Sequence, residues 1–274
     1  MGGTFQLIEN QSGLAYLSIP FFDKTGLTVS AFSTRIGGCS LPPYQGLNMA
    51  FHVGDDAEIV VKNRQLLCHA LGLRLENLVA GNQVHGDEVA VVNRQHLGRG
   101  SLDMMGALPD TDGLICIEPN IPLAAFFADC VPVFLLDPVK KAIGLAHAGW
   151  KGTVLEIAQK TLQKMQDRFG SQPSGCLAAI GPSIGPCCYE VDARVLDMVK
   201  QYLPYAREVI QPISSQKGML DLWQANAIAL EKAGIPAGSI SVSGLCTACN
   251  TQMFFSHRKE EGRTGRMAAL LMLK

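Results

Sequence analysis

The chain has 274 residues, of which 47% are hydrophobic and 17% charged, and its formal net charge is −1. This composition is typical of a globular protein with a sizeable core and excludes a disordered chain. Because the sequence has neither a net positive charge nor a basic run, we expect no nucleic acid and no anionic membrane as partner. A small-molecule ligand is favoured instead.

No segment is predicted to cross a membrane. The longest apolar stretch, residues 114–137, is interrupted by Pro, Asn, Glu and Asp, which a spanning helix of about 20 apolar residues would not tolerate. The N-terminus lacks a charged region followed by an apolar one, so no secretory signal is predicted. We expect a cytoplasmic protein whose nine cysteines are mostly free thiols.

The first half of the chain is predicted to be rich in strands. Residues 27–34 have the pattern of a strand and lead into a loop rich in Gly and Pro. Residues 55–72 start with two aspartates and stop at a glycine, the polarity that favours a helix. Six short β-rich runs follow, at residues 78–85, 88–93, 113–117, 123–129, 132–137 and 142–148.

The second half is predicted to alternate helices with strands. An amphipathic helix is expected over residues 152–170, with an apolar face formed by Val154, Ala158, Leu162, Met165 and Phe169. Further elements are expected as a strand at 176–180, helices near 192–203 and 221–233, and strands around 240 and 267. The mixture predicts an α/β or α+β fold, a layered sandwich of mixed β-sheet covered by helices. With no linker or repeat visible, a single domain is expected over residues 1–274.

Three residues suggest a metal site. His85, Cys130 and His147 each stand at the end of an apolar run, beside a Gly, Ala or Pro, so one edge of a sheet could gather them. One thiolate and two imidazoles suit zinc, and three protein ligands leave a fourth position open for catalysis. Their spacing matches no short zinc motif. Unrelated core residues, or a hydrolytic pair of Cys130 with a histidine, therefore remain open alternatives.

Seven motifs in order resemble one known family, from about residue 28 to the C-terminus: FSTRIGG, LNMAFHVGDD, QVHGDEV, FFADCVPVFLLD, AHAGWKGT, AIGPSIGPCCYEV and FFSHRKEEGRTGRMA. They are similar to the YfiH-like family of laccase-domain or polyphenol-oxidase-like proteins, now regarded as purine nucleoside phosphorylases of a distinct kind. The resemblance implies that His85, Cys130 and His147 bind the metal, with His85 and Cys130 also catalytic. Zinc is the expected metal, and copper is an alternative.

The resemblance also implies a reaction and its partners. Adenosine, inosine or guanosine would react with phosphate to give a free purine and ribose 1-phosphate. Cleavage of methylthioadenosine and deamination of adenosine would accompany this activity. The expected partners are therefore a purine nucleoside and phosphate, and the oligomeric state is not predicted. A metal with an open position could generate the hydroxide that deamination requires.

Arg35 and Asp129 are further catalytic candidates. The guanidinium of Arg35 offers a fork of donors suited to phosphate, and the family counts this arginine in its active site, so we expect it to bind substrate as well. On a strand, Asp129 would point away from the face of Cys130. A bend at Pro132 would let it partner a ligand histidine or accept a proton; the alternative is a structural hydrogen bond.

Asn48 and Arg258 are candidates for substrate binding. Asn48 could reach the pocket, although an Asn in a turn usually satisfies its own backbone. Arg258 could receive phosphate or the sugar, although a charged run is usually a solvated face. It belongs to a C-terminal cluster with His257, Lys259, Arg263 and Arg266.

The remaining cysteines carry weaker signals. Cys246 and Cys249 have CxxC spacing but lack a second CxxC and a clear redox context, so a buried thiol pair is favoured over a redox site. Cys187 and Cys188 are expected to pack in a turn beside the pocket.

Three rival functions are open. A cysteine-nucleophile hydrolase acting on cell-wall precursor peptides would use Cys130 as nucleophile and a histidine as base. A copper oxidase of phenols would need many more histidines than the six present, and His52, His69 and His96 lie in unrelated sequence contexts. The third rival is a regulatory or partner-binding protein without catalysis, against which an open metal position would count.

Overall fold

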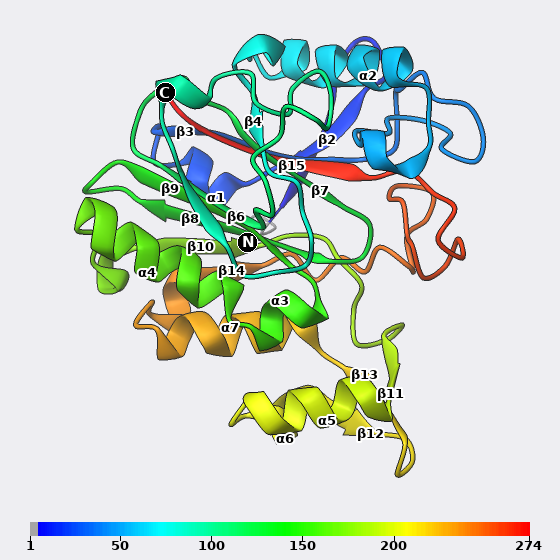
Figure 1. The fold of residues 1–274 in the computed structure, drawn as a ribbon, viewed down its shortest axis with the longest axis vertical. Coiled ribbons are helices and arrows are strands. Elements are labelled where there is room, and N and C mark those ends of the chain that lie inside the picture. Colours follow the sequence, from blue (N-terminus) through cyan, green and yellow to red (C-terminus); the bar gives the residue numbers. More distant parts are fainter. Residues whose placement is uncertain (1–4) are drawn as a thin grey trace.

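The computed structural model describes residues 5–274 and contains two six-stranded sheets stacked face to face (Figure 1). The first sheet has the strand order β1-β2-β3-β15-β7-β4. Its strands are β1 (Gln6–Glu9), β2 (Ala15–Ser18), β3 (Thr28–Ser33), β15 (Met267–Leu273), β7 (Leu123–Phe127) and β4 (Val79–Ala80). The C-terminal strand β15 pairs antiparallel with both β3 and β7, so the two ends of the sequence share this sheet.

The second sheet has the order β14-β10-β8-β9-β6-β5. Its strands are β14 (Ile240–Val242), β10 (Leu177–Ile180), β8 (Val131–Asp137), β9 (Ala142–Ala148), β6 (Gly113–Cys116) and β5 (Val89–Val92). Parallel pairs at both edges flank antiparallel pairs at the centre, so the sheet is mixed. A small third sheet contains β11 (Glu190–Asp192), β13 (Lys217–Leu220) and β12 (Ile210–Pro212).

Helices cover the outer faces of both large sheets. One side is covered by α2 (Ala57–Ala70), whose Leu67 and Cys68 join a core with Phe126 of the first sheet. The other side is covered by α3 (Trp150–Val154), α4 (Ile157–Phe169) and α7 (Leu222–Lys232) (Figure 1). The short α1 (Pro20–Asp23) packs on β3, and α5 (Ala193–Tyr202) and α6 (Ala206–Val209) accompany the small sheet. This mixed α+β sandwich of one domain is the predicted fold class; the predicted domain bounds begin in residues 1–4, which lie outside the described residues.

Continuous apolar runs form the central strands because both faces of the second sheet are buried. In β8, Val133 and Leu135 pack toward the helices, whereas Phe134 and Leu136 pack toward the first sheet. This alternation is the period of two that a strand imposes on its side chains. A strand buried on both faces has no reason to alternate apolar with polar residues, so residues 131–136 of β8 are all apolar and only the last residue, Asp137, is charged.

Most of the predicted elements are confirmed, with two corrections. The predicted helix over 152–170 is two helices, because Glu156 adopts a left-handed conformation (φ 63°) between α3 and α4. The predicted strand over 78–85 is limited to Val79–Ala80. After it the chain runs as a loop to His85, which itself has a positive φ of 62°. A prediction from periodicity could not detect the break at Glu156, since it depends on the backbone conformation of a single residue.

The helix lengths bear on membrane association. Within residues 5–274 the longest helix is α2, with 14 residues. None of the described helices could span a bilayer, which requires about 20 apolar residues.

Candidate functional site

Cys130 and His147 come together through the pairing of β8 with β9. The antiparallel register places Pro132 opposite His147 and Val131 opposite Ala148. Cys130 immediately precedes β8, in a tight turn where Asp129 has a positive φ of 83°. The thiol and the imidazole therefore meet at the same end of two buried, hydrogen-bonded strands, which hold a site more rigidly than loops do.

Asp112 positions both histidines of the candidate site. It immediately precedes β6, which pairs with β9, and its Oδ1 lies 2.7 Å from His147 Nδ1. The same carboxylate accepts hydrogen bonds from the backbone N–H groups of Val84, His85 and Gly86, at 3.0, 3.1 and 2.8 Å. One buried carboxylate thus orients the His147 ring and also holds the loop that presents His85.

The three side chains form a compact donor set. The candidate ligand atoms of His85, Cys130 and His147 all lie within 4.8 Å of one another. The two imidazole rings are 4.8 Å apart between centroids and nearly perpendicular. Because Asp112 engages Nδ1 of His147, Nε2 is the ring nitrogen left for a metal, which is the usual arrangement of a histidine ligand.

The electrostatics of the cluster favour a thiolate. Burial alone would raise the pKa of Cys130, but the His147 and His85 imidazoles lower it well below the ordinary value. Burial would lower the pKa of His147, but the Cys130 sulfur and the Asp112 carboxylate raise it. A thiolate is the form of cysteine that binds metals or acts as a nucleophile.

The cluster lies in the wall of a cavity of about 420 Å³. Its aromatic and apolar wall includes Phe126, Trp150 and Tyr189, and its polar wall carries two arginines and further histidines. The lining residues are His52, Gln83, His85, Phe126, Ala128, Asp129, Cys130, His147, Trp150, Tyr189, His257, Arg258 and Arg266. Ligand pockets typically measure about 300–1,000 Å³, so a small molecule of nucleoside size would fit.

Asp129 and Arg258, two of the predicted site residues, line this cavity. Both oxygens of Asp129 are engaged: Oδ1 accepts from the Thr247 hydroxyl at 2.6 Å and Oδ2 from the Arg258 backbone N–H at 2.6 Å. Asp129 is therefore not the partner of a ligand histidine; Asp112 is. Arg258 donates to the Glu190 carbonyl at 2.8 Å and its guanidinium stacks 5.1 Å from the Tyr189 ring centroid.

Arg35 and Asn48, the other two predicted site residues, are not brought into this cavity. Arg35 Nη1 donates to the Thr251 carbonyl and to Glu260 Oε1, at 2.9 and 3.0 Å, and its guanidinium lies over the Phe255 ring. Asn48 is fully buried, and its Oδ1 accepts from the backbone N–H of Arg266 at 2.9 Å. Both residues support segments that carry cavity residues.

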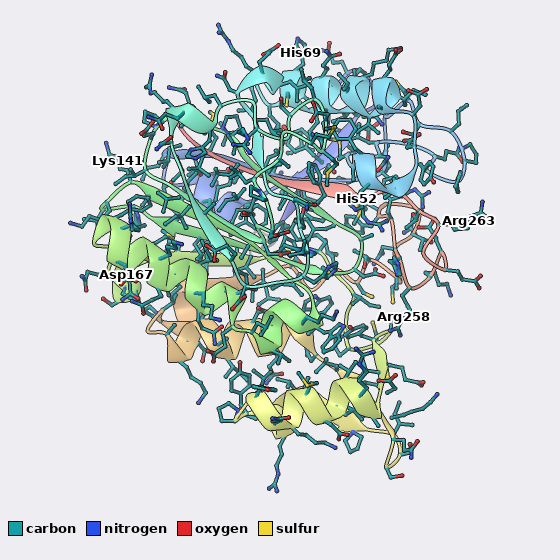
Figure 2. All side chains as sticks on the ribbon, in the orientation of Figure 1. His52, His69, Lys141, Asp167, Arg258 and Arg263 are labelled. Atoms are coloured by element: carbon teal, nitrogen blue, oxygen red, sulfur yellow. The ribbon has the colours of Figure 1, made fainter. Side chains whose placement is uncertain are left out.

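Several cavity residues were not identified from the sequence. His52, placed in an unrelated context above, lines the cavity, as does Arg266 of the C-terminal cluster; Figure 2 labels His52 and Arg258. Burial, followed by the Arg266 charge, lowers the pKa of His52 to about 4, so its imidazole is neutral near pH 7. Asp112, which orients His147, was also not identified from the sequence. The signal that could have indicated it is its position directly before the apolar run 113–117.

Gly149 tests how tightly the donor set is packed. A Cβ at this position would lie 2.8 Å from Cys130 Sγ and 3.1 Å from His85 Cδ2. Because its φ of −68° suits any residue, Gly149→Ala should displace the two side chains and leave the backbone unchanged. We expect metal affinity, measured by chelator competition, to fall about tenfold or more.

Gly175→Ala is the matched control for this variant, since an added Cβ there meets nothing within 4 Å. Equal metal affinity in the two variants would contradict the packing described for the donor set.

The sequence and the structure are similar to those of known proteins. A family model described as multi-copper polyphenol oxidoreductase laccase matches residues 29–274. The chain is 40% identical over 246 residues to the purine nucleoside phosphorylase YlmD of Bacillus subtilis (strain 168), covering 90% of this chain and 88% of the relative. It is 34% identical over 247 residues to adenosine deaminase RL5 from an unknown prokaryotic organism, covering 89% and 94%. The crystal structure of YlmD from Geobacillus stearothermophilus matches with a TM-score of 0.93 and 40% identity, over 100% of both chains.

Proposed function

The chain belongs to the family described as multi-copper polyphenol oxidoreductase laccase, and we propose that it is a zinc-dependent purine nucleoside phosphorylase with accompanying adenosine deaminase activity. The observation that carries the proposal is a donor set of one cysteine and two histidines in the wall of a cavity that also holds aromatic rings and two arginines. Adenosine, inosine, guanosine and methylthioadenosine are the proposed substrates.

The donor set fits zinc better than copper oxidase chemistry. One thiolate and two imidazoles are ligand types that zinc binds, and a set of three protein ligands leaves the fourth position open, as in catalytic zinc sites. When bound there, the metal would polarise an oxygen of water or substrate. A multicopper site would need more histidines than the six in this chain, and His69 and His96 lie outside the cavity.

Different residues of the cavity wall suit different parts of the substrate. Trp150 and Tyr189 offer flat aromatic surfaces on which a purine could stack, a contact worth about 1–3 kcal/mol per base in nucleic-acid complexes. Arg258 and Arg266 offer guanidinium forks suited to phosphate oxygens. Nη1 of Arg266 donates to the carbonyls of Thr264 and Gly265, at 2.8 and 2.9 Å, which holds this side chain in place before phosphate arrives.

The protein's contribution to phosphorolysis is then orientation and charge. Holding phosphate beside the ribose converts an encounter of two molecules into a step within one complex. The arginines neutralise the phosphate as it approaches the electron-poor ribosyl carbon. Asp129 holds the Arg258 backbone, so it acts as a positioning residue for the phosphate site, and neutral His52 can hydrogen-bond to the substrate.

Arg35 lies outside the cavity, so an indirect role replaces the direct contact with substrate that was predicted for it. Through Glu260 and the Thr251 carbonyl it anchors the segment 251–260, which contains His257 and Arg258. We propose that it supports phosphate binding by holding this segment, in the way that Asn48 supports Arg266.

Arg258→Ala should raise the KM for phosphate by about tenfold or more, because a hydrogen bond to a charged group contributes about 1.5–3 kcal/mol. The KM for adenosine should change less, and steady-state kinetics with each substrate varied in turn will separate the two. Arg263→Ala is the matched control, since Arg263 belongs to the same C-terminal cluster but is exposed and outside the cavity lining. Equal phosphate KM values for both variants would contradict the assignment.

Product analysis tests the proposed function itself. Purified, metal-analysed protein is incubated with adenosine, with and without phosphate, and adenine, inosine and hypoxanthine are separated by chromatography. Phosphate-dependent release of adenine supports phosphorolysis, and inosine formed without phosphate supports deamination. Absence of both reactions from metal-loaded protein would overturn the proposal.

A cysteine hydrolase is the second candidate, because one observation favours it. Cys130, His147 and Asp112 have the relative order of a nucleophile, a base and an orienting acid, with His147 Nδ1 2.7 Å from Asp112 Oδ1. In that case thiol alkylation of metal-free protein should abolish hydrolysis of peptide or amide substrates, and added zinc should inhibit. If zinc instead activates turnover, the phosphorylase is favoured.

A further inference from the structure

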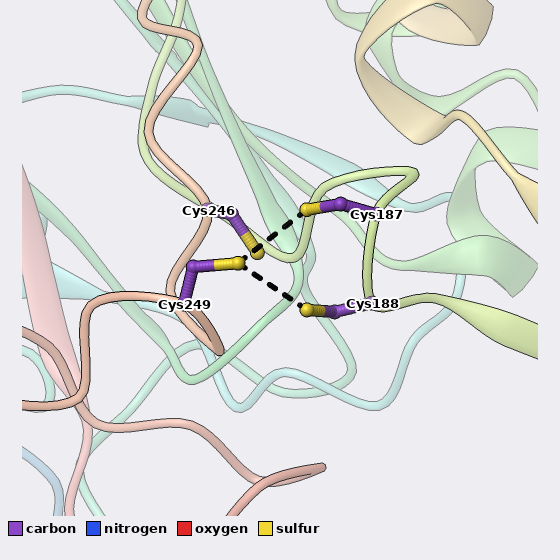
Figure 3. Close-up of side chains that lie close together, drawn as sticks. All are labelled: Cys187, Cys188, Cys246 and Cys249. Carbon is purple, nitrogen blue, oxygen red and sulfur yellow. Dashed lines mark hydrogen bonds between the residues drawn. The ribbon is translucent and has the colours of Figure 1, made fainter.

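Four cysteines outside the cavity lie together, although their sequence positions are far apart (Figure 3). Cys187 and Cys188 belong to the loop between β10 and β11, and Cys246 and Cys249 belong to the turn after β14. Strands β10 and β14 run parallel, so their following loops leave the same edge of the sheet. A bridge between Ser183 and Cys246 extends this pairing into the loops.

The distances among the four sulfurs are those of a ligand cage. Cys249 Sγ lies 3.5 Å from Cys187 Sγ and 3.4 Å from Cys188 Sγ, and all four sulfurs lie within 4.8 Å of one another. A tetrahedral zinc ion with Zn–S bonds of about 2.3 Å separates its sulfurs by about 3.8 Å. A disulfide would require about 2.05 Å, and all nine cysteines are free thiols in the structure.

We propose that Cys187, Cys188, Cys246 and Cys249 bind one zinc ion in a closed structural site, separate from the His85–Cys130–His147 centre. Four thiolates complete a tetrahedral shell and leave no open position, which is the composition of structural rather than catalytic zinc. No carboxylate or imidazole takes part in this cluster, and soft sulfur ligands select zinc over magnesium, calcium or manganese.

The surroundings of the cluster resemble those of a metal-thiolate site. The backbone N–H of Gly185 donates to Cys246 Sγ at 3.2 Å, a contact that stabilises a thiolate and orients it. Cys246 and Cys249 have the two-residue spacer that is common among zinc ligands. Cys187 and Cys188 are adjacent, and the turn formed by Gly185 with Cys188 and Tyr189 brings both of their sulfurs to Cys249.

One of the two loops that zinc would join lines the cavity, and the other hydrogen-bonds to a residue that lines it. Tyr189, which follows Cys188, lines the cavity beside Arg258. Thr247, which lies between the other two cysteines, donates to Asp129 Oδ1 at 2.6 Å. A metal at the four sulfurs would therefore fix Tyr189 and Asp129 relative to each other. The expected role is to hold the nucleoside site in shape, without contact with the substrate.

Metal analysis of purified variants tests the proposal. Protein isolated under reducing conditions should contain two zinc ions per chain. His85→Ala and the double variant Cys187→Ser/Cys249→Ser should each contain one. Cys39→Ser, which alters an exposed cysteine outside both clusters, should retain two. In Cys249→His a Cys₃His shell can still bind zinc, so two ions are expected again.

X-ray absorption at the zinc edge gives a readout that does not depend on the stability of cysteine variants. In His85→Ala the remaining zinc should show four sulfur ligands at about 2.3 Å and no nitrogen. Failure of the proposed phosphorylase activity would leave this result unchanged, so the two proposals can fail separately. Absence of zinc from His85→Ala, a mixed sulfur and nitrogen shell in that variant, or a disulfide among these four cysteines in mass spectra would each overturn the structural site.

Discussion

Replacing Cys130 with serine should reduce phosphorolysis and deamination together, by about 10³-fold or more. The physical reason is that a catalytic metal contributes several kcal/mol of charge stabilisation, and serine replaces the only soft ligand of the donor set. Metal content should fall by one ion per chain, and the thermal midpoint should fall only by the stabilisation that this ion gives, because Cys130 lines a cavity and the replacement itself is nearly isosteric. Metal analysis and kcat/KM for both reactions measure the effect.

Cys39→Ser again serves as the control for Cys130→Ser, since it removes an exposed thiol from a loop outside the cavity. Phosphorolysis that survives at the native rate in Cys130→Ser protein lacking this metal would contradict the assignment of the centre.

Replacing Asp112 with asparagine should lower metal affinity and activity by about 10–100-fold, the usual cost of losing a partner that orients a metal ligand. The carboxylate accepts from three backbone N–H groups around His85 as well as engaging His147 Nδ1. An amide has a single acceptor oxygen, so its NH₂ group must face either a backbone N–H or the ring nitrogen. Both ligands should be disturbed by this one change.

Chelator competition and kcat/KM check the effect of Asp112→Asn. Asp110→Asn is a matched control, because Asp110 is exposed two residues earlier in the chain and belongs to neither metal cluster. If the two variants bind metal equally, Asp112 does not orient the centre.

The central strands could be predicted because local sequence determines them. Residues 132–136 and 142–146 are apolar throughout, and a strand buried on both faces is the simplest structure for such a run. The start of α2 could be predicted for the same local reason: Asp56 caps it by accepting from the N–H groups of Glu58 and Ile59. The break at Glu156 could not, because a single left-handed residue leaves the apolar period of the helix intact.

Site residues were harder to predict because contacts distant in sequence position them. Asp112 reaches His147 through the pairing of β6 with β9, and His52 enters the cavity from a short helical turn before α2. Arg35 points toward Glu260 rather than the cavity, a choice made by a segment more than two hundred residues away. The resemblance of motifs identified the three candidate ligands together, which their spacing alone did not.

The four-cysteine cluster could not be predicted either, because it also depends on contacts between residues distant in sequence. Cys246 and Cys249 were predicted to be a buried thiol pair, but Cys249 is exposed, and both cysteines meet partners from a different loop. Cys187 and Cys188 stand about sixty residues earlier, so only the parallel pairing of β10 with β14 reveals that the two pairs meet.

Phosphorus NMR of the native protein incubated with adenosine and phosphate tests the central claim most directly. The account predicts ribose 1-phosphate in an amount equal to the adenine released, and none from His85→Ala protein that retains its other zinc. Release of free ribose in place of ribose 1-phosphate, or undiminished turnover by His85→Ala, would contradict it.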